Sequence, residues 1–302
     1  MLRAAAALRR PRALAALGAA SLFGLRLAPA PAAAASSLAS PQAPPAPAAA
    51  TSTPPRLPTV VLYQYESCPF CNKVRAYLDW RRIPYIVVEV DPLFKGALAF
   101  SEYKKVPLAV IDGVAVPDST AIIDALEARL RAAGAIAPAA AAAPAAAVDP
   151  WRAWSDAVLV KHLTVNIYRS WPEALQTFDY LTQRNFPAWS AAAAKYIGAA
   201  AMVAVAGKRR KELGVAPAQG AERAALAAVL GELEGGLAGR PFLGGAAAGL
   251  GDVSCYGVLR SIRALPTYTE AVLGHPGAAA WCARMEGAVG GSMLQHRVGE
   301  KA

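Results

Sequence analysis

The sequence TVVLYQYESCPFCNKVRAYLDW, residues 59–80, places two cysteines three residues apart where an apolar strand gives way to a helix. Thr59–Tyr65 is rich in β-branched and aromatic residues, which predicts a strand. The apolar spacing from Asn72 to about Trp80 predicts an amphipathic helix. Cys68 therefore falls at the helix N-terminus, where unsatisfied N–H groups and the helix dipole favour an anion.

This placement predicts a lowered pKa for the Cys68 thiol, which would then be partly thiolate at neutral pH. Pro69 suits the first helical turn because its missing N–H has no partner to lose there. Cys71 lies one turn further along the helix, and we expect it to be more buried. This asymmetry suits a nucleophilic thiol followed by a resolving thiol, with a zinc half-site and two structural cysteines as the alternatives.

The remaining cysteines and the histidines do not favour zinc. Zinc would need two further ligands in a comparable cluster. Cys255 and Cys282 stand singly in helix-like sequence, and His162, His275 and His296 form no pair. The sequence therefore predicts no metal site and indicates thiol or redox chemistry.

The segments after the cysteines alternate between strand and helix patterns. Strands are predicted at Pro84–Val90, Leu108–Ile111 and Val114–Val116, and helices at Lys95–Tyr103 and from Ser119 to about Arg131. The order strand-helix-strand-helix-strand-strand-helix resembles the thioredoxin fold, in which a CxxC motif follows the first strand. In that resemblance Pro107 holds the position that is cis and faces the cysteines.

The residues around Pro107 suit the binding of a thiol-containing peptide. Extended backbone at Val106 can pair with the backbone of a cysteine-containing peptide. The Ser119 hydroxyl and the N–H groups of its helix can hold a carboxylate, and Asp118 can pair with an ammonium group. Together these predict a glutathione site with Cys68 near the ligand sulfur. An ordinary helix N-cap is the alternative for Asp118 and Ser119.

Longer motifs make the resemblance specific to one family. The segments LYQYESCPFCNKVRAYLDWRRIPYIVVEVDP and YKKVPLAV resemble the membrane-associated prostaglandin E synthase type 2 family. Further along, WRAWSDAVLVKHL, NIYRSWPEALQTFDY, KYIGAAAM, RPFLGG and GDVSCYGVLR are similar in order and content, so the resemblance covers about residues 57–290. It implies an α/β thioredoxin-like N-terminal domain of the glutaredoxin type, followed by an all-α C-terminal domain of the glutathione-transferase type.

The family's namesake reaction isomerises prostaglandin H2, a lipid endoperoxide, to prostaglandin E2. The resemblance implies that Cys68 is the catalytic thiol, that Tyr65 is its hydrogen-bonding neighbour, and that Phe70 and Cys71 line the same site. It also implies glutathione, or another small thiol, as the cofactor. The matching cofactor-binding positions are Val106, Pro107, Asp118 and Ser119.

Haem is a doubtful cofactor on the same comparison. Family members place a histidine where this chain has Lys161, and His162 stands one residue later. One residue on a helix is a turn of about 100°, so the imidazole would point elsewhere.

Two further functional classes stay open beside the isomerase. In a glutaredoxin-like, glutathione-dependent oxidoreductase, Cys68 would attack a disulfide and Cys71 would resolve the mixed disulfide; a glutathione transferase belongs to the same class. The other class is a non-catalytic glutathione-binding module. Both thiol mechanisms need Cys68, whereas only the reductase needs Cys71.

The N-terminal segment has the composition of an organelle-targeting signal. The first 65 of the 302 residues contain no acidic residue and six arginines, which account for +6 of the formal +10. Residues 1–57 are thus predicted to be a transit peptide and an Ala/Pro-rich disordered segment, directing the protein to a mitochondrion or plastid. This segment could also associate with a membrane. Nucleic acid is not expected as a partner, because the rest shows no basic stripe with interleaved aromatics.

The remaining chain divides at an Ala/Pro-rich stretch. We predict a thioredoxin-like domain at residues 58–132, a linker at 133–148 and a helical domain at 149–302, and a homodimer is a further expectation. Tyr196–Gly207 is small and apolar, which predicts a close-packed buried helix. A lipid substrate needs an apolar wall. The first helix after the linker is expected to supply it, with Leu159, Leu163 and Tyr168 facing Tyr65 and Phe70.

Overall fold

The computed structural model describes residues 56–137, 149–183, 186–216 and 218–298. The predicted transit segment and most of the predicted linker lie outside these residues. Thr53–Ala302 forms one contact unit, in which a thioredoxin-like half (residues 56–137) packs against a helical half (residues 149–298).

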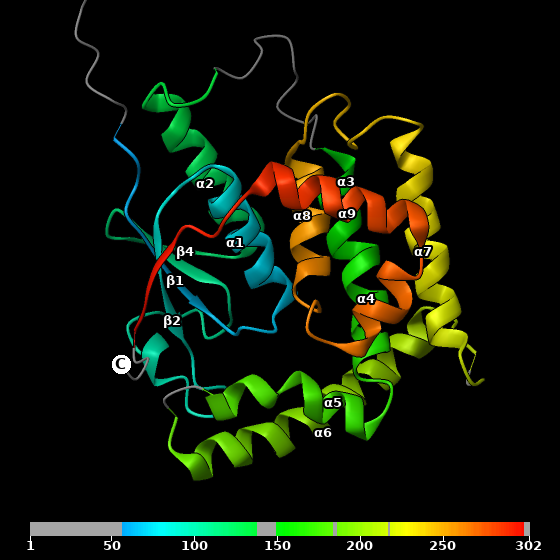
Figure 1. The fold of residues 1–302 in the computed structure, drawn as a ribbon. Coiled ribbons are helices and arrows are strands. Elements are labelled where there is room, and N and C mark those ends of the chain that lie inside the picture. Colours follow the sequence, from blue (N-terminus) through cyan, green and yellow to red (C-terminus); the bar gives the residue numbers. More distant parts are fainter. Residues whose placement is uncertain (1–55, 138–148, 184–185, 217, 299–302) are drawn as a thin grey trace, which may run out of the picture. The chain divides into compact units, whose positions relative to one another are not determined.

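The thioredoxin-like half contains the predicted strands around one central sheet (Figure 1). β1 pairs with β2 in parallel and with β3 in antiparallel, and β3 pairs with β4. The β3–β4 turn has positive φ at Asp112 and Gly113, as the predicted Asp-Gly hairpin requires. The elements are β1 (Val60–Gln64), α1 (Pro69–Trp80), β2 (Tyr85–Glu89), η1 (Gly96–Leu98), β3 (Leu108–Ile111), β4 (Val114–Pro117) and α2 (Ser119–Ala132).

Two elements in this half differ from the sequence prediction. The helix expected over Lys95–Tyr103 is only the short 3-10 turn η1. A fifth strand, β5 (Leu294–Val298), returns from the chain's C-terminal part and pairs in parallel with β2 at the sheet edge (Figure 1, red). Its sequence, LQHRV, carries little strand signal. The Met293 N–H donates to Asp79 Oδ1 (2.8 Å), which directs the segment onto the sheet.

The helical half confirms the all-α C-terminal domain that the resemblance implied. Two segments are π-helical (η2 and η4) and one is 3-10 (η3). The elements are α3 (Pro150–Trp154), η2 (Ser155–Leu159), α4 (Val160–Ile167), α5 (Trp171–Thr177), η3 (Asp179–Gln183), α6 (Ala188–Glu212), α7 (Ala221–Leu237), α8 (Leu250–Arg260), η4 (Tyr268–Leu273) and α9 (Pro276–Val289).

The two halves meet where α1 crosses α8, and the crossing is close enough to require glycine. A Cβ atom built on Gly257 would lie 2.5 Å from the Lys73 Cα and 2.8 Å from the Asn72 carbonyl oxygen. At the far end of the crossing Arg260 Nη1 pairs with Asp79 Oδ2 at 2.7 Å. The Lys73 ammonium is fully buried and lies 2.8 Å from both carboxylate oxygens of Asp156 in η2. Apolar packing and buried ion pairs therefore join the halves.

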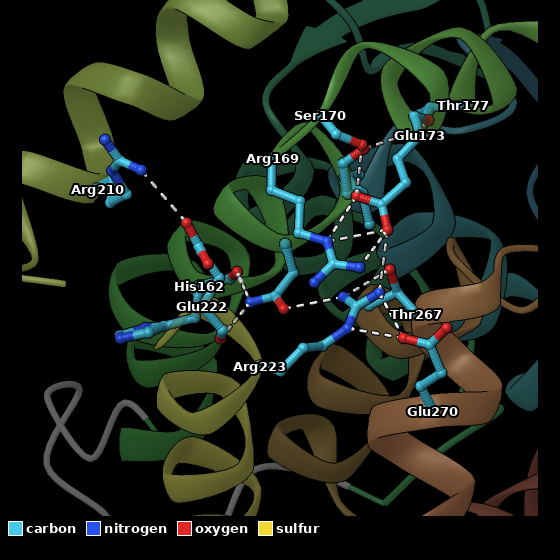
Figure 2. Close-up of polar contacts among 12 residues, drawn as sticks. His162, Arg169, Ser170, Glu173, Thr177, Arg210, Glu222, Arg223, Thr267 and Glu270 are labelled. Carbon is cyan, nitrogen blue, oxygen red and sulfur yellow. Dashed lines mark hydrogen bonds and ion pairs between the residues drawn. The ribbon is translucent and has the colours of Figure 1, made fainter. Parts of the chain in front are cut away.

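A polar network ties α4, α5, α7 and η4 together (Figure 2). The Arg223 guanidinium donates to Asn166 Oδ1 and Thr267 Oγ1, both at 2.9 Å, and pairs with Glu270. Arg169 holds Glu173 with both its Nε and Nη2 atoms. These contacts join four elements of the helical half, so the network acts as a structural brace.

Helix α6 is less buried than its composition suggested. Its Tyr196 and Ile197 side chains are 55% and 58% exposed, so the prediction of a close-packed buried helix is wrong. Contacts with α5, η3 and α4 cover one face of α6, and the small residues allow this face to lie close to its neighbours. By length and composition alone α6 could cross a membrane, but core helices of soluble proteins pass the same test.

Candidate active site

Cys68 and Cys71 lie where the sequence placed them, at the start of α1. Cys68 is the N-cap residue with extended backbone, and its N–H donates to the Tyr65 carbonyl (3.0 Å). The Asn72 side chain donates to the Glu66 and Cys68 carbonyls at 2.7 and 3.1 Å, which holds the loop before the helix. Cys68 is half-buried and Cys71 is buried, as the asymmetry of a nucleophile and a resolving thiol requires.

The two thiols have opposite pKa shifts. The Cys71 thiol can donate a hydrogen bond to the Cys68 sulfur, and this lowers the pKa of Cys68; the N–H groups of Cys71 and Phe70 act in the same direction. Burial raises the pKa of Cys71 well above its ordinary value, and the neighbouring Cys68 charge raises it further. Cys68 is thus the thiol that ionises first, while Cys71 stays protonated as a donor.

A small aromatic cluster lies beside the thiols. Tyr65, Tyr103 and Val106 pack against the buried side chains of Val90, Leu98 and Leu108. Burial raises the pKa of Tyr65 to about 12, and the charges of Cys68 and Cys71 contribute to the shift. Burial also raises the pKa of Tyr103, with contributions from Asp118 and Cys68. Both phenols therefore stay protonated at neutral pH and remain hydrogen-bond donors near the Cys68 sulfur.

A carboxylate from β2 lies beneath this loop. Glu89 accepts from the Glu66 N–H (2.6 Å) and from Gln64 Nε2 (3.1 Å). Burial raises the pKa of Glu89 to about 7, against the lowering effects of Gln64, Arg297 and Arg75. The negative charge of Glu89 in turn raises the pKa values of Cys68 and Cys71. Glu89 is thus a titratable neighbour of the thiols, and no motif or spacing in the sequence marked it as one.

The predicted glutathione positions face the same region. The Val106–Pro107 peptide bond is cis, as the thioredoxin-fold resemblance implied. Within the described part of the chain, the Val106 N–H and C=O bond to no other described residue, so both can pair with a ligand backbone. Val106 and Tyr103 belong to one apolar cluster, and the charges of Asp118 and Cys68 both raise the pKa of Tyr103. These contacts bring the cis-peptide, Asp118 and the thiols to one site.

Asp118 and Ser119 differ from each other in the groups that each could offer to glutathione. Asp118 has φ +71°, a strained backbone for a non-glycine residue. Its Oδ1 accepts from the Thr120 and Ala121 N–H groups at 2.8 and 3.3 Å, so the N-cap alternative holds for this oxygen. The exposed Oδ2 stays available for an ammonium group. Ser119 is only 1% exposed, and its N–H lies at the first turn of α2, where helix N–H groups can donate to a carboxylate.

The helical half contributes aromatic residues to the thiol region. The Cys68 charge raises the pKa of Tyr168 beyond the effect of burial, so Tyr168 lies near the thiol as expected. Leu159 and Leu163 are fully buried in the main core and form no exposed wall, which corrects that part of the prediction. Phe70 packs against this main core with the Lys73 ammonium over its ring, whereas Tyr65 packs in the smaller cluster.

Sequence reasoning missed Tyr180 at this site. Tyr180 lies beside Ser67, next to Cys68 in the chain, and burial raises the pKa of its hydroxyl with contributions from Glu89 and Tyr65. The residue stands in the FDY motif that carried part of the family resemblance, and Tyr103 stands in YKKVP. Both motifs marked these tyrosines as part of the family resemblance, but neither motif showed that the side chains would lie near the thiols.

No further support for haem comes from this geometry. His162 Nδ1 lies 3.0 Å from the Val158 carbonyl, in a contact within its own helix. Lys161, at the position of the family's histidine, is half-buried. Among the described residues no group of three or more histidines, cysteines or acidic side chains could hold a metal ion. Lys161 and His162 therefore do not fit the role of a haem-binding histidine.

The fold and site define a class: a glutathione-transferase fold, with a thioredoxin-like half and a helical half. The N-terminal domain family of glutathione S-transferases matches residues 62–133, and the C-terminal domain family matches residues 187–284. A variant of human glutathione S-transferase T1-1, in its apo form, superimposes with a TM-score of 0.50 and 21% identity, over 76% of this chain and 84% of that chain.

Two curated proteins define the relationship more closely. Mouse prostaglandin E synthase 2 is 32% identical over 288 residues, which are 79% of this chain and 72% of the mouse protein. Zebrafish (Danio rerio) prostaglandin E synthase 2 is 30% identical over 268 residues, which are 75% of this chain and 70% of that protein. The chain therefore belongs to the prostaglandin E synthase 2 family, and it is a glutathione-related enzyme with the predicted two-part fold.

Proposed function

We propose that this protein isomerises prostaglandin H2, or a related lipid endoperoxide, with Cys68 as the catalytic thiol and glutathione as the bound cofactor. The observation that carries the proposal is the placement of Cys68, half-buried at the N-cap of α1, with buried Cys71 one turn further along; the opposite pKa shifts of the two thiols agree with it. Membership of the prostaglandin E synthase 2 family supports the substrate class.

The site supplies the groups that such an isomerisation needs. The Cys68 thiolate would form an S–O bond to the oxygen on ring carbon C9 while the O–O bond breaks, and the other oxygen would take a proton to become a hydroxyl. Loss of the C9 proton then forms the ketone and breaks the S–O bond, which regenerates the thiolate. Tyr65, protonated because its pKa is about 12, would act as the proton donor of the small cluster.

Glutathione would occupy the cleft marked by Val106, Asp118 and Ser119. The free backbone of Val106 would pair with the cysteine residue of the tripeptide. Asp118 Oδ2 would take the ammonium group, and the Ser119 N–H would take the neighbouring carboxylate. Bound this way, glutathione would carry its sulfur toward Cys68.

A second function, glutaredoxin-like reduction of mixed disulfides, is favoured by the position of Cys71. Its thiol lies within hydrogen-bonding reach of the Cys68 sulfur, so it could attack a disulfide formed at Cys68. In that reaction Cys68 joins the substrate sulfur and expels a thiolate, and Cys71 then displaces the substrate. The dithiol becomes a disulfide, which glutathione must reduce.

The test assays one protein on both substrates. The parent chain and the Cys68→Ser, Cys71→Ser and Cys255→Ser variants are given prostaglandin H2 and a glutathione mixed disulfide. The isomerase proposal expects loss of prostaglandin E2 formation in Cys68→Ser, retention in Cys71→Ser, and no change in Cys255→Ser, since Cys255 is buried beside Trp151. Equal isomerisation by the parent and Cys68→Ser would refute the catalytic role.

Location and assembly are separate proposals. We infer that residues 1–57 direct the protein to a mitochondrion or plastid, supported by the acid-free, arginine-containing sequence. A fluorescent fusion of residues 1–58 that remains in the cytosol would defeat this. Membrane association through the same segment and a homodimer are tested by flotation with vesicles and by light scattering.

A further inference from the structure

A cavity of about 670 Å³ opens on the side of α1 that bears Asn72, Arg75 and Asp79. Cys68 belongs to the same helical face, because residues 68, 72, 75 and 79 recur at the i, i+4, i+7 and i+11 spacing. The cavity lining includes Glu66 and Ser67, which directly precede Cys68 in the chain, and it continues along the helix to Asp79. Its other walls include Ser67, Thr177, Tyr180, Arg260 and Leu265.

Two guanidinium groups in this cavity have buried nitrogens without partners. Arg75 Nε and Arg260 Nη2 are buried and make no hydrogen bond within the described part of the chain. Arg260 uses its Nη1 on Asp79, so only part of its donor capacity is used. A buried N–H without an acceptor costs roughly 1–3 kcal/mol and more when charged, so such groups call for an explanation. Arg75 lines the cavity and has no acceptor among the described residues, so its guanidinium is available to an anion bound in the cavity.

The other charges on the wall already have partners. Asp79 pairs with Arg260, Asp179 pairs with Lys195, and Arg263 pairs with Glu286. Glu66 lies 3.8 Å from Arg297. Arg75 differs because it forms no ion pair with another described residue. Its charge lowers the pKa of Glu89. The unbalanced charge of the cavity is therefore positive and lies at Arg75.

The residues that line the cavity suit a ligand with a carboxylate at the end of an apolar chain. Guanidinium N–H groups match the two oxygens of a carboxylate. Ala264, Leu265 and Pro266 provide apolar surface beside the arginines. Arg75 stands seven residues after Cys68, about 10 Å along the helix, which an acyl chain of ordinary length spans.

We propose that this cavity binds the carboxylate end of an acyl-lipid substrate, with Arg75 as the anchor and Arg260 as the second donor. The proposal rests on the function proposed above, because it positions the chain of such a substrate so that its reactive part reaches Cys68. Arg75 is then a binding residue that selects acids over their neutral esters.

The test measures binding without turnover. Calorimetry on the full chain carrying Cys68→Ser uses arachidonic acid and its methyl ester, both below their aggregation concentrations, and glutathione as a third ligand. We expect the acid to bind at least about tenfold more tightly than the ester, the range for hydrogen bonds to a charged group. Adding Arg75→Gln should weaken acid binding about tenfold and leave ester binding unchanged.

Matched variants separate this effect from loss of charge or of folding. Arg263→Gln removes the same charge from the same cavity wall, but Arg263 is half exposed and already paired. It should change acid affinity less than about threefold. Arg75→Lys keeps the charge and should retain part of the preference for the acid. If Arg75→Gln does not fold, the affinities of the parent and of Arg75→Lys for the acid and for the ester still test the proposal.

Equal binding of acid and ester by the parent would overturn the proposal, and so would an unchanged preference for the acid in Arg75→Gln. A third contrary result is a tenfold loss of glutathione binding in Arg75→Gln while acid binding stays unchanged. The last result would assign the cavity to a glutathione carboxylate. Because the probes do not react, this outcome is independent of the isomerase assay. Acid selectivity without isomerisation would support the cavity and refute the proposed reaction.

Discussion

Helix α1 belongs to two unlike regions. Its N-terminus forms the thiol site, defined here by Tyr65, Cys68, Cys71, Glu89 and Tyr103, where pKa values are shifted and Glu89 accepts a hydrogen bond from the loop at Glu66. Its middle forms the α1–α8 crossing, where Gly257 lets the helices touch. The comparison teaches that one helix can be fixed by packing at its middle while its N-terminus holds a thiol of lowered pKa beside Glu89, whose pKa is about 7.

This difference predicts two kinds of mutational effect. Changes at the α1–α8 crossing should lower the free energy of unfolding and leave the thiol pKa values almost unchanged. Changes at the thiol site should alter pKa values, pH dependence and ligand affinity, with small effects on stability at neutral pH. The predictions below run from the largest expected effect to the smallest.

The largest effect is expected for Gly257→Ala. A Cβ there meets backbone atoms of Lys73 and Asn72 at 2.5 and 2.8 Å, and backbone cannot move aside as a side chain can. We expect a loss of about 3 kcal/mol in the free energy of unfolding, measured by urea denaturation. The control is Gly235→Ala in α7, where a Cβ meets nothing within 4 Å; it should stabilise by about 0.5–1 kcal/mol. Similar values for both variants would contradict a close crossing.

Lys73→Met should cost somewhat less, about 2 kcal/mol, because it leaves Asp156 without its cation. The Asp156 side chain is 31% exposed, so water compensates for part of the loss. The double variant Lys73→Met/Asp156→Leu should recover most of the stability. The matched surface control, Arg263→Gln, should change stability by less than about 0.5 kcal/mol. No recovery in the double variant would mean that Lys73 acts through packing alone.

Glu89→Gln tests the thiol site through pH. The pKa of Glu89 in the folded protein is about 7, above the ordinary 4.5, so its stabilising contribution is complete below the ordinary value and is lost as the pH rises through 7. Glutamine imitates the protonated carboxyl. The variant should therefore match the parent at pH 4.5 and exceed it by about 1–2 kcal/mol at pH 8. Parallel stability curves for the two proteins would remove Glu89 from the account.

The smallest effect concerns the glutathione positions. Asp118→Asn removes the charge that would pair with the ligand ammonium and should weaken glutathione binding by about 1 kcal/mol. Ser119→Ala should change the affinity less than twofold, because the Ser119 side chain is buried and its N–H survives the substitution. Calorimetry on both variants decides. A larger loss for Ser119→Ala than for Asp118→Asn would restore the hydroxyl as the carboxylate donor.

Much of the fold could be predicted because its signals are local. The β-branched run before Cys68, the Asp-Gly turn and the apolar helical spacing each identify one element within a few residues. The relative placement of the two thiols follows from the same short segment. The cis bond at Pro107 and the two-part architecture came from the family resemblance, which the relatives confirm.

What could not be predicted depends on contacts between distant segments. Strand β5 forms only because Asp79 and β2 provide partners more than 200 residues earlier in the chain. Glu89 and Tyr180 reach the thiols from β2 and from the helical half, and neither position is marked by sequence spacing. The exposure of α6 was mispredicted for the same reason, because apolar composition does not say which neighbours cover a helix.

The identity of the reactive thiol is the central claim, and selective alkylation tests it most directly. The parent protein is treated with iodoacetamide across the pH range, and mass spectrometry follows each cysteine. The lowered pKa of Cys68 and the raised pKa of Cys71 predict that Cys68 is modified first, with an apparent pKa below the roughly 8.5 of a free cysteine. Modification of Cys71 first, or titration of Cys68 at the free value, would contradict the account.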